Sequence, residues 1–185
     1  MKIRLASELQ IDSIVDGPGI RTVIWTQGCS HNCLGCHNPS THDFKGGFLK
    51  EINELKEELD MLSFQDGVTF SGGDPFFQPE ACAILANHIH SLGMDVWCYT
   101  GFTFEQLLEN SKKNKKIMNF LTEIDIIVDG KFELDKRNLD LKFRGSSNQR
   151  IIDVNKSLKQ GKTVVLDLDE KIIFNFGRNS ENIYV

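Results

Sequence analysis

The sequence predicts an α/β fold in which short buried strands alternate with helices along most of the chain. Segments rich in β-branched and aromatic residues recur between segments in which leucine and isoleucine follow a helical spacing. Turns that contain Gly, Asp or Thr follow these strand segments directly. Such an order is typical of βα units around a parallel sheet. A length of 185 residues favours one domain.

The first predicted elements are a strand at 21–26 and a helix at 48–62. The strand segment reads RTVIWT, and β-branched and aromatic residues favour a buried strand. The helix is predicted because Leu and Ile recur in its segment at about the helical period. A short strand at 68–70 follows and ends at a Ser-Gly-Gly turn.

Two more helix and strand pairs are predicted after this turn. Pro79 suits the first turn of a helix, where its missing N–H has no partner to lose. Thr103 and Gln106 have the spacing of a capping box at the start of the next helix. The predicted elements are a helix at 79–92, a strand at 94–99, a helix at 103–121 and a strand at 124–128.

The end of the chain is less regular. One more strand is expected at 150–154, and the segments 163–168 and 171–176 flank an Asp-Glu pair as in a β-hairpin, although this turn lacks Gly or Asn. We therefore divide the chain into a core of about 10–155 and a small C-terminal extension of about 156–185.

Composition and charge exclude several classes of protein. The 21 basic and 26 acidic residues give a net charge of −5, which argues against broad binding to nucleic acid. No apolar run approaches the length of a membrane span, and the first residues lack the apolar segment of a secretory signal. We expect a cytoplasmic protein whose partners include neither nucleic acid nor a membrane.

The cysteines carry the strongest chemical signal in the sequence. The chain has five cysteines, and an odd number without a secretory signal argues against a disulfide framework. Cys29, Cys33 and Cys36 form a C-x3-C-x2-C pattern, which suits a 4Fe–4S cluster with one iron left open for substrate. Cys82 and Cys98 are expected to be small buried residues.

A structural zinc site remains an alternative, because zinc takes four ligands and a histidine of the same loop would complete the set. The candidates for that fourth ligand are His31, His37 and His42. In either case, turns that follow parallel strands gather at one edge of the sheet. The distinctive turns at 27–38, 71–77, 99–102 and 129–132 are therefore expected to form one site.

The cysteine pattern after the first strand resembles that of the radical S-adenosylmethionine (SAM) superfamily. The segment at 13–21, SIVDGPGIR, resembles one that the activating enzymes of glycyl-radical proteins carry before this strand. The segments at 144–153, RGSSNQRIID, and 124–132, IDIIVDGKF, are similar to motifs of the family that activates anaerobic ribonucleoside-triphosphate reductases. The resemblance covers about residues 10–155.

This resemblance implies a single radical SAM domain over 1–185, with a partial TIM-like barrel of about five or six βα units. It implies an enzyme that uses a 4Fe–4S cluster and SAM to make a 5′-deoxyadenosyl radical. That radical would remove a hydrogen atom from a glycine of the anaerobic reductase, with electrons from a low-potential donor. The alternatives are an activase of another glycyl-radical enzyme, such as pyruvate formate-lyase, and a non-catalytic zinc-binding module.

The resemblance also implies roles for single residues. The cluster ligands would be Cys29, Cys33 and Cys36, and no side chain need act as an acid or base. Asp74 would accept a hydrogen bond from the SAM ammonium group, together with the carbonyls of the two glycines before it. The residues expected to bind the cofactors are Gly35, Cys36, His37, Gly72, Gly73, Asp74, Thr100, Asp129 and Lys131.

Gly35 stands where the wider superfamily often has an aromatic residue, and the reductase activases also have a glycine there.

Five other residues keep more than one interpretation. The residues that either brace the fold or contact SAM or the partner are Asp16, Arg21, Arg144, Asn148 and Arg150.

Overall fold

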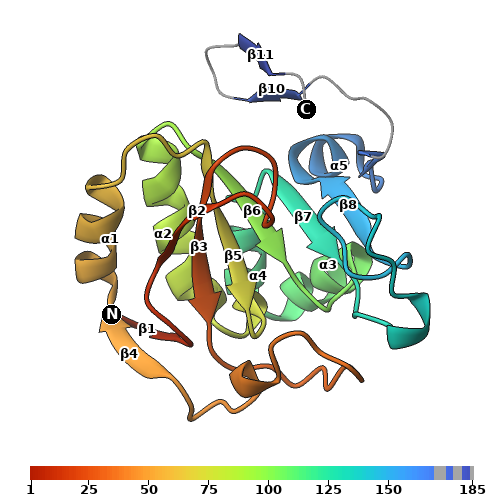
Figure 1. Ribbon diagram of the computed structural model, residues 1–185, viewed down its shortest axis with the longest axis horizontal. Coiled ribbons are helices and arrows are strands. Elements are labelled where there is room, and N and C mark those ends of the chain that lie inside the picture. Colours follow the sequence, from red (N-terminus) through yellow and green to blue (C-terminus); the bar gives the residue numbers. More distant parts are fainter. Residues whose placement is uncertain (169–173, 177–180, 184–185) are drawn as a thin grey trace.

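The computed structural model describes residues 1–168, 174–176 and 181–183 of the chain (Figure 1). Its strands are β1 (Lys2–Leu5), β2 (Gln10–Ser13), β3 (Arg21–Thr26), β4 (Phe48–Glu51), β5 (Gly67–Gly72), β6 (Asp95–Tyr99), β7 (Ile126–Asp129), β8 (Arg150–Asp153), β9 (Val165–Leu166), β10 (Phe174–Phe176) and β11 (Glu181–Ile183). Its α-helices are α1 (Ile52–Asp60), α2 (Pro79–Ser91), α3 (Phe104–Lys113), α4 (Lys115–Leu121) and α5 (Val154–Gln160). Three short 3-10 helices are η1 (Pro39–Thr41), η2 (Pro75–Phe77) and η3 (Leu134–Lys136).

The fold is mixed α/β and is built on a 9-stranded sheet in the order β4-β1-β3-β5-β6-β7-β8-β9, with β2 paired to β3. Strands β3, β5, β6 and β7 are parallel neighbours, and helices lie in the connections between them. This central part confirms the predicted alternation of strands and helices. The sheet is open, because its edge strands β4 and β9 do not pair with each other.

The number of predicted parallel units is too high. Strand β8, which matches the strand expected at 150–154, runs antiparallel to β7, and β9 runs antiparallel to β8. The reason is the connection after β7, which contains only the short η3 in place of a crossover helix. A chain that returns without such a crossover places the next strand antiparallel.

Three predicted elements also differ in detail. The predicted helix at 48–62 begins as strand β4, because β1, which the sequence did not predict, offers it an antiparallel partner. The predicted helix at 103–121 is two helices, since Asn114 is extended and its side chain caps α4 at Lys116. The predicted capping box of Thr103 and Gln106 is confirmed.

The C-terminal prediction is only partly described by the structure. The predicted hairpin between 163–168 and 171–176 is wrong in its pairing, because β9 pairs with β8 and β10 pairs with β11. The predicted turn falls in residues 169–173, which lie outside the described residues, as do 177–180 and 184–185. The expected start of the C-terminal extension at about 156 falls inside α5.

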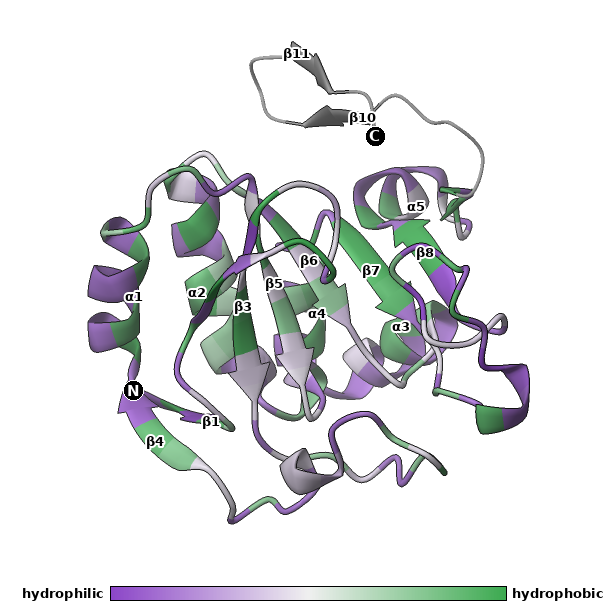
Figure 2. Ribbon diagram, in the orientation of Figure 1, coloured by the Kyte–Doolittle hydropathy of each residue, from purple (hydrophilic) through white to green (hydrophobic). Residues whose placement is uncertain are grey.

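Successive side chains of the central strands point to opposite faces of the sheet. Ile24, Phe70, Cys98 and Ile127 occupy neighbouring strands and are buried in the main core beneath the helices. Figure 2 shows the same pattern, with apolar residues on the central strands and polar residues on the outer side of α1. Cys82 is also fully buried, which confirms the prediction for both cysteines outside the cysteine loop.

A buried cation lies on the other face of the sheet. Arg21 is fully buried, forms an ion pair with Asp95 and donates from Nε to the Thr69 hydroxyl at 2.8 Å. Its guanidinium also lies 5.5 Å from the ring centroid of Trp97. Burial raises the pKa of Asp95, although the positive charge of Arg21 opposes this effect. Of the two interpretations left open for Arg21, the structure supports bracing of the fold.

His90 on α2 bonds to Asp125, the residue before β7, and we expect this contact to make a pH-dependent contribution to the stability of the fold. The hydrogen bond to Asp125, at 3.0 Å, raises the pKa of His90, and the nearby Glu123 adds to this effect. Because the pKa of His90 is higher in the folded protein, its protonation stabilises the fold fully at pH values below its pKa in the unfolded chain, about 6.5. This contribution is lost as the pH rises through the pKa of the folded protein. We expect His90→Gln to lower the free energy of unfolding by up to about 1 kcal/mol near pH 5.5 and by less near pH 8.5.

Urea unfolding at the two pH values measures this difference. An equal loss at both would show that the charge of His90 contributes nothing to folding.

None of the helices in the described residues is both long and apolar enough to cross a membrane.

Candidate functional site

The carboxyl ends of β3, β5, β6 and β7 meet at one edge of the sheet, and the cysteine-bearing segment lies there. Figure 1 shows this segment in orange, below the arrowheads of β3 and β5. The amide of Asp74 donates to the carbonyl of Gly28 at 3.0 Å, and the Lys131 ammonium donates to the carbonyl of His31 at 3.3 Å. The structure therefore brings together the turns that the sequence predicted to share a site.

Two glycine-containing segments pack against each other at this edge. A Cβ atom at Gly73 would lie 2.5 Å from the carbonyl oxygen of Gly28, which leaves no room for a side chain. Gly72 has φ of +100°, a conformation that residues with a Cβ rarely adopt. The Gly-Gly-Asp turn can therefore approach the cysteine loop at backbone distance, which other residues at these positions would prevent.

The three cysteine thiols are unpaired and lie near one another. Cys29 is buried, and Cys33 and Cys36 are half-buried. Burial raises the pKa of Cys29 to about 11 and also raises the pKa of Cys33, and the neighbouring thiols add to both effects. Loss of the protons of Cys29 and Cys33 therefore needs a compensating positive charge, which metal ions supply.

Each of these thiols lies near at least one backbone amide. The N–H of His31 stabilises the Cys29 thiolate, and the N–H of Phe132 stabilises the Cys33 thiolate. The N–H of Asn38 donates to the Cys36 sulfur at 3.4 Å. Hydrogen bonds to sulfur are one of the ways in which proteins tune iron–sulfur clusters.

The donor set fits a cluster better than it fits zinc. The loop offers three cysteines, and two of the three candidates for a fourth zinc ligand are engaged elsewhere, with His31 Nε2 bonded to Asp74 and the His37 ring packed on Phe132. A single zinc ion needs four ligands that converge on one point, whereas a 4Fe–4S cluster places each cysteine on a different iron. The zinc alternative is therefore not favoured.

Asp74 is at the centre of the site and is 1% exposed. Its Oδ2 accepts hydrogen bonds from His31 Nε2 at 2.7 Å, the Thr100 hydroxyl at 2.8 Å and the Gly101 amide at 2.9 Å. Its Oδ1 accepts from the Phe76 amide at 3.0 Å. The chain therefore uses Oδ2 fully, whereas Oδ1 keeps one acceptor position. Asp74 and Thr100 thus join three of the segments at this edge.

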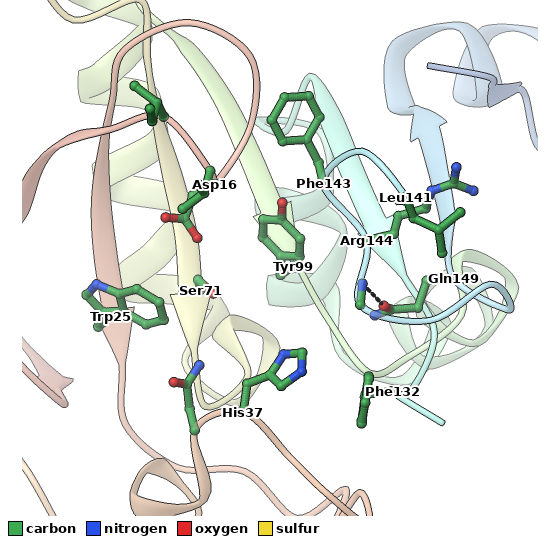
Figure 3. Close-up of a pocket in the computed structure, with 14 residues that line it drawn as sticks. Asp16, Trp25, His37, Ser71, Tyr99, Phe132, Leu141, Phe143, Arg144 and Gln149 are labelled. Carbon is green, nitrogen blue, oxygen red and sulfur yellow. Dashed lines mark hydrogen bonds between the residues drawn. The ribbon is translucent and has the colours of Figure 1, made fainter. Parts of the chain in front are cut away.

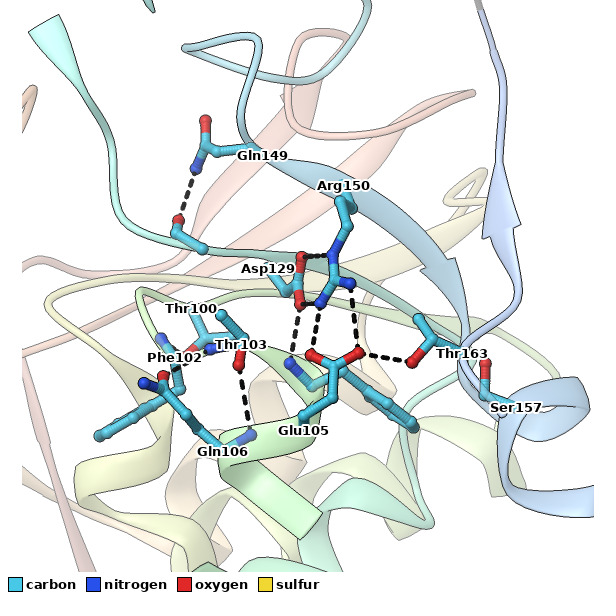
Figure 4. Close-up of polar contacts among 12 residues, drawn as sticks. Thr100, Phe102, Thr103, Glu105, Gln106, Asp129, Gln149, Arg150, Ser157 and Thr163 are labelled. Carbon is cyan, nitrogen blue, oxygen red and sulfur yellow. Dashed lines mark hydrogen bonds and ion pairs between the residues drawn. The ribbon is translucent and has the colours of Figure 1, made fainter. Parts of the chain in front are cut away.

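Asp129 is also fully buried, and its partners lie on the flank of the site (Figure 4). Arg150 forms an ion pair with Asp129 and with Glu105, and Asp129 Oδ2 accepts from the Phe104 amide at 2.7 Å. The hydrogen bond from Arg150 lowers the pKa of Glu105 to about 2. Arg150 therefore braces β7, β8 and α3, one of the interpretations that the sequence left open.

Lys131 lies beside the cysteine loop, as its position in the sequence predicted. Besides its bond to the loop, its positive charge lowers the pKa of Cys33. Two amide side chains hold the segment that carries it: Asn148 donates to the Lys131 carbonyl at 2.8 Å, and Gln149 donates to the Gly130 carbonyl at 3.1 Å. Asn148 is thus a bracing residue.

A cavity of about 510 Å³ opens next to the third cysteine, on the face of the sheet opposite the helices (Figure 3). Trp25, Ser71 and Tyr99 form its floor, one from each of three neighbouring strands. Its rim comes from the loop before β3 and the loop before β8, and His37 and Arg144 also line it. His37 packs on Phe132 with ring centroids 4.6 Å apart.

The floor residues Trp25, Ser71 and Tyr99 were not among the residues predicted singly to bind the cofactors, although Ser71 and Tyr99 begin two of the turns predicted to form the site. The alternation within each strand could have indicated them, because each lies one position beyond a core residue. Burial raises the pKa of Tyr99, and the carboxylate of Asp16, also in the cavity wall, adds to this effect. The Tyr99 phenol therefore keeps its proton.

The structure explains the glycine before the third cysteine. Gly35 has φ of +73°, and a Cβ atom there would lie 2.9 Å from Leu134 Cδ1. An aromatic residue at this position would be strained and would collide with the segment after β7. Leu134 therefore packs where the wider superfamily often has an aromatic side chain.

Comparison with known proteins identifies a matching family and several relatives. A family model described as a 4Fe-4S single cluster domain matches residues 15–152. The anaerobic ribonucleoside-triphosphate reductase-activating protein of Enterobacteria phage T4 is 36% identical over 146 residues, which is 74% of this chain and 86% of that protein. The proteins of the same name from Salmonella typhi and Escherichia coli K12 are 36% and 35% identical over 144 residues, which is 74% of this chain and 90% of each.

The segment that the family model matches contains the cysteine loop and the ends of the four parallel strands. The match supports an iron–sulfur cluster in this chain.

Proposed function

Because the chain belongs to the family of anaerobic ribonucleoside-triphosphate reductase-activating proteins, we propose that it activates such a reductase by a radical SAM reaction. The chain is an activating enzyme with an iron–sulfur domain. The radical SAM class, the cofactor SAM, the low-potential electron donor and the reductase as partner are parts of this proposal. The open sheet would correspond to a partial barrel, in a single domain.

The observation that carries the proposal is the cysteine loop beside the cavity. Cys29, Cys33 and Cys36 would hold a 4Fe–4S cluster and leave one iron without a protein ligand. When bound, the cluster and SAM would supply the chemistry, which is one-electron cleavage of SAM and removal of a hydrogen atom from a glycine of the reductase. The chain itself positions the reactants and limits the access of water.

The cavity wall suits SAM, which carries an apolar adenine and a charged methionine end. The aromatic rings of Trp25, Tyr99 and Phe132 offer apolar surface, and Asp16 offers a carboxylate. Gly72 and Gly73 let the backbone come close to the amino group, as the sequence predicted. His37 lines the cavity, and Gly35 lies within the cysteine loop.

Asp74 stays a proposed contact of the SAM ammonium group. Its Oδ2 already accepts three hydrogen bonds from the chain, whereas Oδ1 accepts one and keeps a second acceptor position. We propose that Asp74 and the glycine carbonyls contact the ammonium group and that Thr100 shapes the SAM site. Asp129, paired with Arg150, would likewise shape the site.

Radical transfer to the reductase tests the proposed function. We expect an anaerobic mixture of this protein, the organism's anaerobic reductase, SAM and a reductant to give the doublet of a glycyl radical in electron paramagnetic resonance. A reductase whose radical glycine is changed to Ala is the matched control and should give no doublet.

Activation of pyruvate formate-lyase is the alternative within the same class. A doublet on a formate-lyase-type protein and none on the reductase would retain the chemistry and overturn the proposed partner. Absence of a radical on both, with a full cluster present, would overturn the activity.

A further inference from the structure

His31 lies between the first two cysteines, and both its backbone and its side chain make contacts within the site. Its N–H stabilises the Cys29 thiolate, and its carbonyl accepts from Lys131 at 3.3 Å. Its ring nitrogen Nε2 lies 2.7 Å from the Asp74 carboxylate, and its side chain is only 8% exposed. The bond joins the histidine ring to a carboxylate oxygen of a buried aspartate.

The ring of His31 fills a tight socket. Phe102 meets it edge-on with ring centroids 4.5 Å apart, and Phe77 lies 5.8 Å away on a tilted plane. A Cβ atom at Gly101 would come within 2.5 Å of the His31 ring, so only glycine leaves room for it. The socket and the carboxylate together fix the position of this ring.

We propose that His31 is a positioning residue for the cluster, which acts by anchoring the cysteine loop to the ends of β5 and β6 through Asp74. The anchor directs the His31 amide at the Cys29 sulfur. The inference deepens the proposed function and rests on it for the identity of the cluster. Its first test therefore uses the cluster-free protein, in which a failure of the proposed chemistry has no effect.

Hydrogen exchange of the cluster-free protein measures the anchor. His31→Phe keeps a ring for the socket and removes the donor, whereas His31→Gln keeps an N–H at a similar reach. Loss of a hydrogen bond to a charged group costs about 1.5–3 kcal/mol, which increases local opening about 10- to 150-fold. We expect amides of residues 30–35 to exchange faster by this factor in His31→Phe and to regain most of their protection in His31→Gln.

The chain offers a matched control for the loss of a His–Asp pair. His88 on α2 also lies 2.7 Å from an aspartate, Asp60, but on the surface between two helices. We expect His88→Phe to leave exchange at 30–35 unchanged. Gly101→Ala provides a second route, because its methyl group would displace the His31 ring without changing the loop itself, and should give the same fast exchange as His31→Phe.

The reduction potential of the reconstituted cluster gives a second readout that a purely structural role would not change. A hydrogen bond to sulfur stabilises the more negative, reduced cluster. We expect a more negative midpoint potential in His31→Phe, the wild-type value in His88→Phe, and recovery in His31→Gln. The proposal is overturned if His31→Phe matches His88→Phe in both exchange and potential, or if His31→Gln behaves as His31→Phe.

Discussion

Replacement of Cys33 with alanine is expected to abolish the iron–sulfur cluster. With three cysteines as the protein ligands, this change leaves one more iron without a ligand and removes the thiolate that the Phe132 amide and Lys131 stabilise. After anaerobic reconstitution, iron should fall from about four atoms per chain to less than about one. Iron and sulfide analysis, with the loss of the brown colour, measures the result.

A cysteine outside the loop is the matched control. Cys82 is fully buried in the core, and Cys82→Ala should keep a full cluster because this thiol lies beneath the helices. A full content of iron and sulfide in Cys33→Ala would exclude Cys33 as a ligand. A colourless wild-type protein that binds one zinc ion would favour the alternative of a zinc-binding module.

The second large effect is expected at the buried cation on the cavity face of the sheet. Arg21→Met removes the partner of Asp95 and leaves its carboxylate, already at a raised pKa, without a counter-charge. Breaking one side of a buried ion pair costs about 3–5 kcal/mol. We expect a loss of this size in the free energy of unfolding, measured by urea denaturation.

The partner variant separates the ion pair from packing. Adding Asp95→Asn to Arg21→Met removes the uncompensated charge, so the double variant should regain part of the loss. A loss below about 1 kcal/mol in Arg21→Met would show that the pair contributes little. A double variant as unstable as the sum of both single variants would assign the loss to packing.

The parallel centre of the fold was predictable because its signals are local. The strand at 21–26 and the helix at 79–92 each fulfil their own pattern, and the turns after the strands had to meet at one edge. The antiparallel β8 was not predictable, since its direction depends on how the chain returns after β7. Strand β1 is short, and its pairing with β4 and β3 makes it a strand.

A feature of the site was predictable when it depends on residues close together in the sequence, and not when it depends on residues far apart. The cysteine loop and the Gly-Gly-Asp turn were found from local patterns of residues. The hydrogen bonds that Asp74 Oδ2 accepts from His31, Thr100 and Gly101 depend on the packing of separate segments. The pairing of Asp129 with Arg150 likewise appears only once β8 lies beside β7.

The loops that border the cavity opening are separate from the strands that stabilise the sheet. The sheet forms its floor, whereas the loop before β3 and the loop before β8 form its rim, with Val15 and Phe143 among the rim residues. Movement of these loops would widen the opening of the cavity and would leave the hydrogen bonds between β3, β5, β6 and β7 intact. The cost of widening the cavity therefore falls on loop contacts and leaves the pairing of the central strands intact.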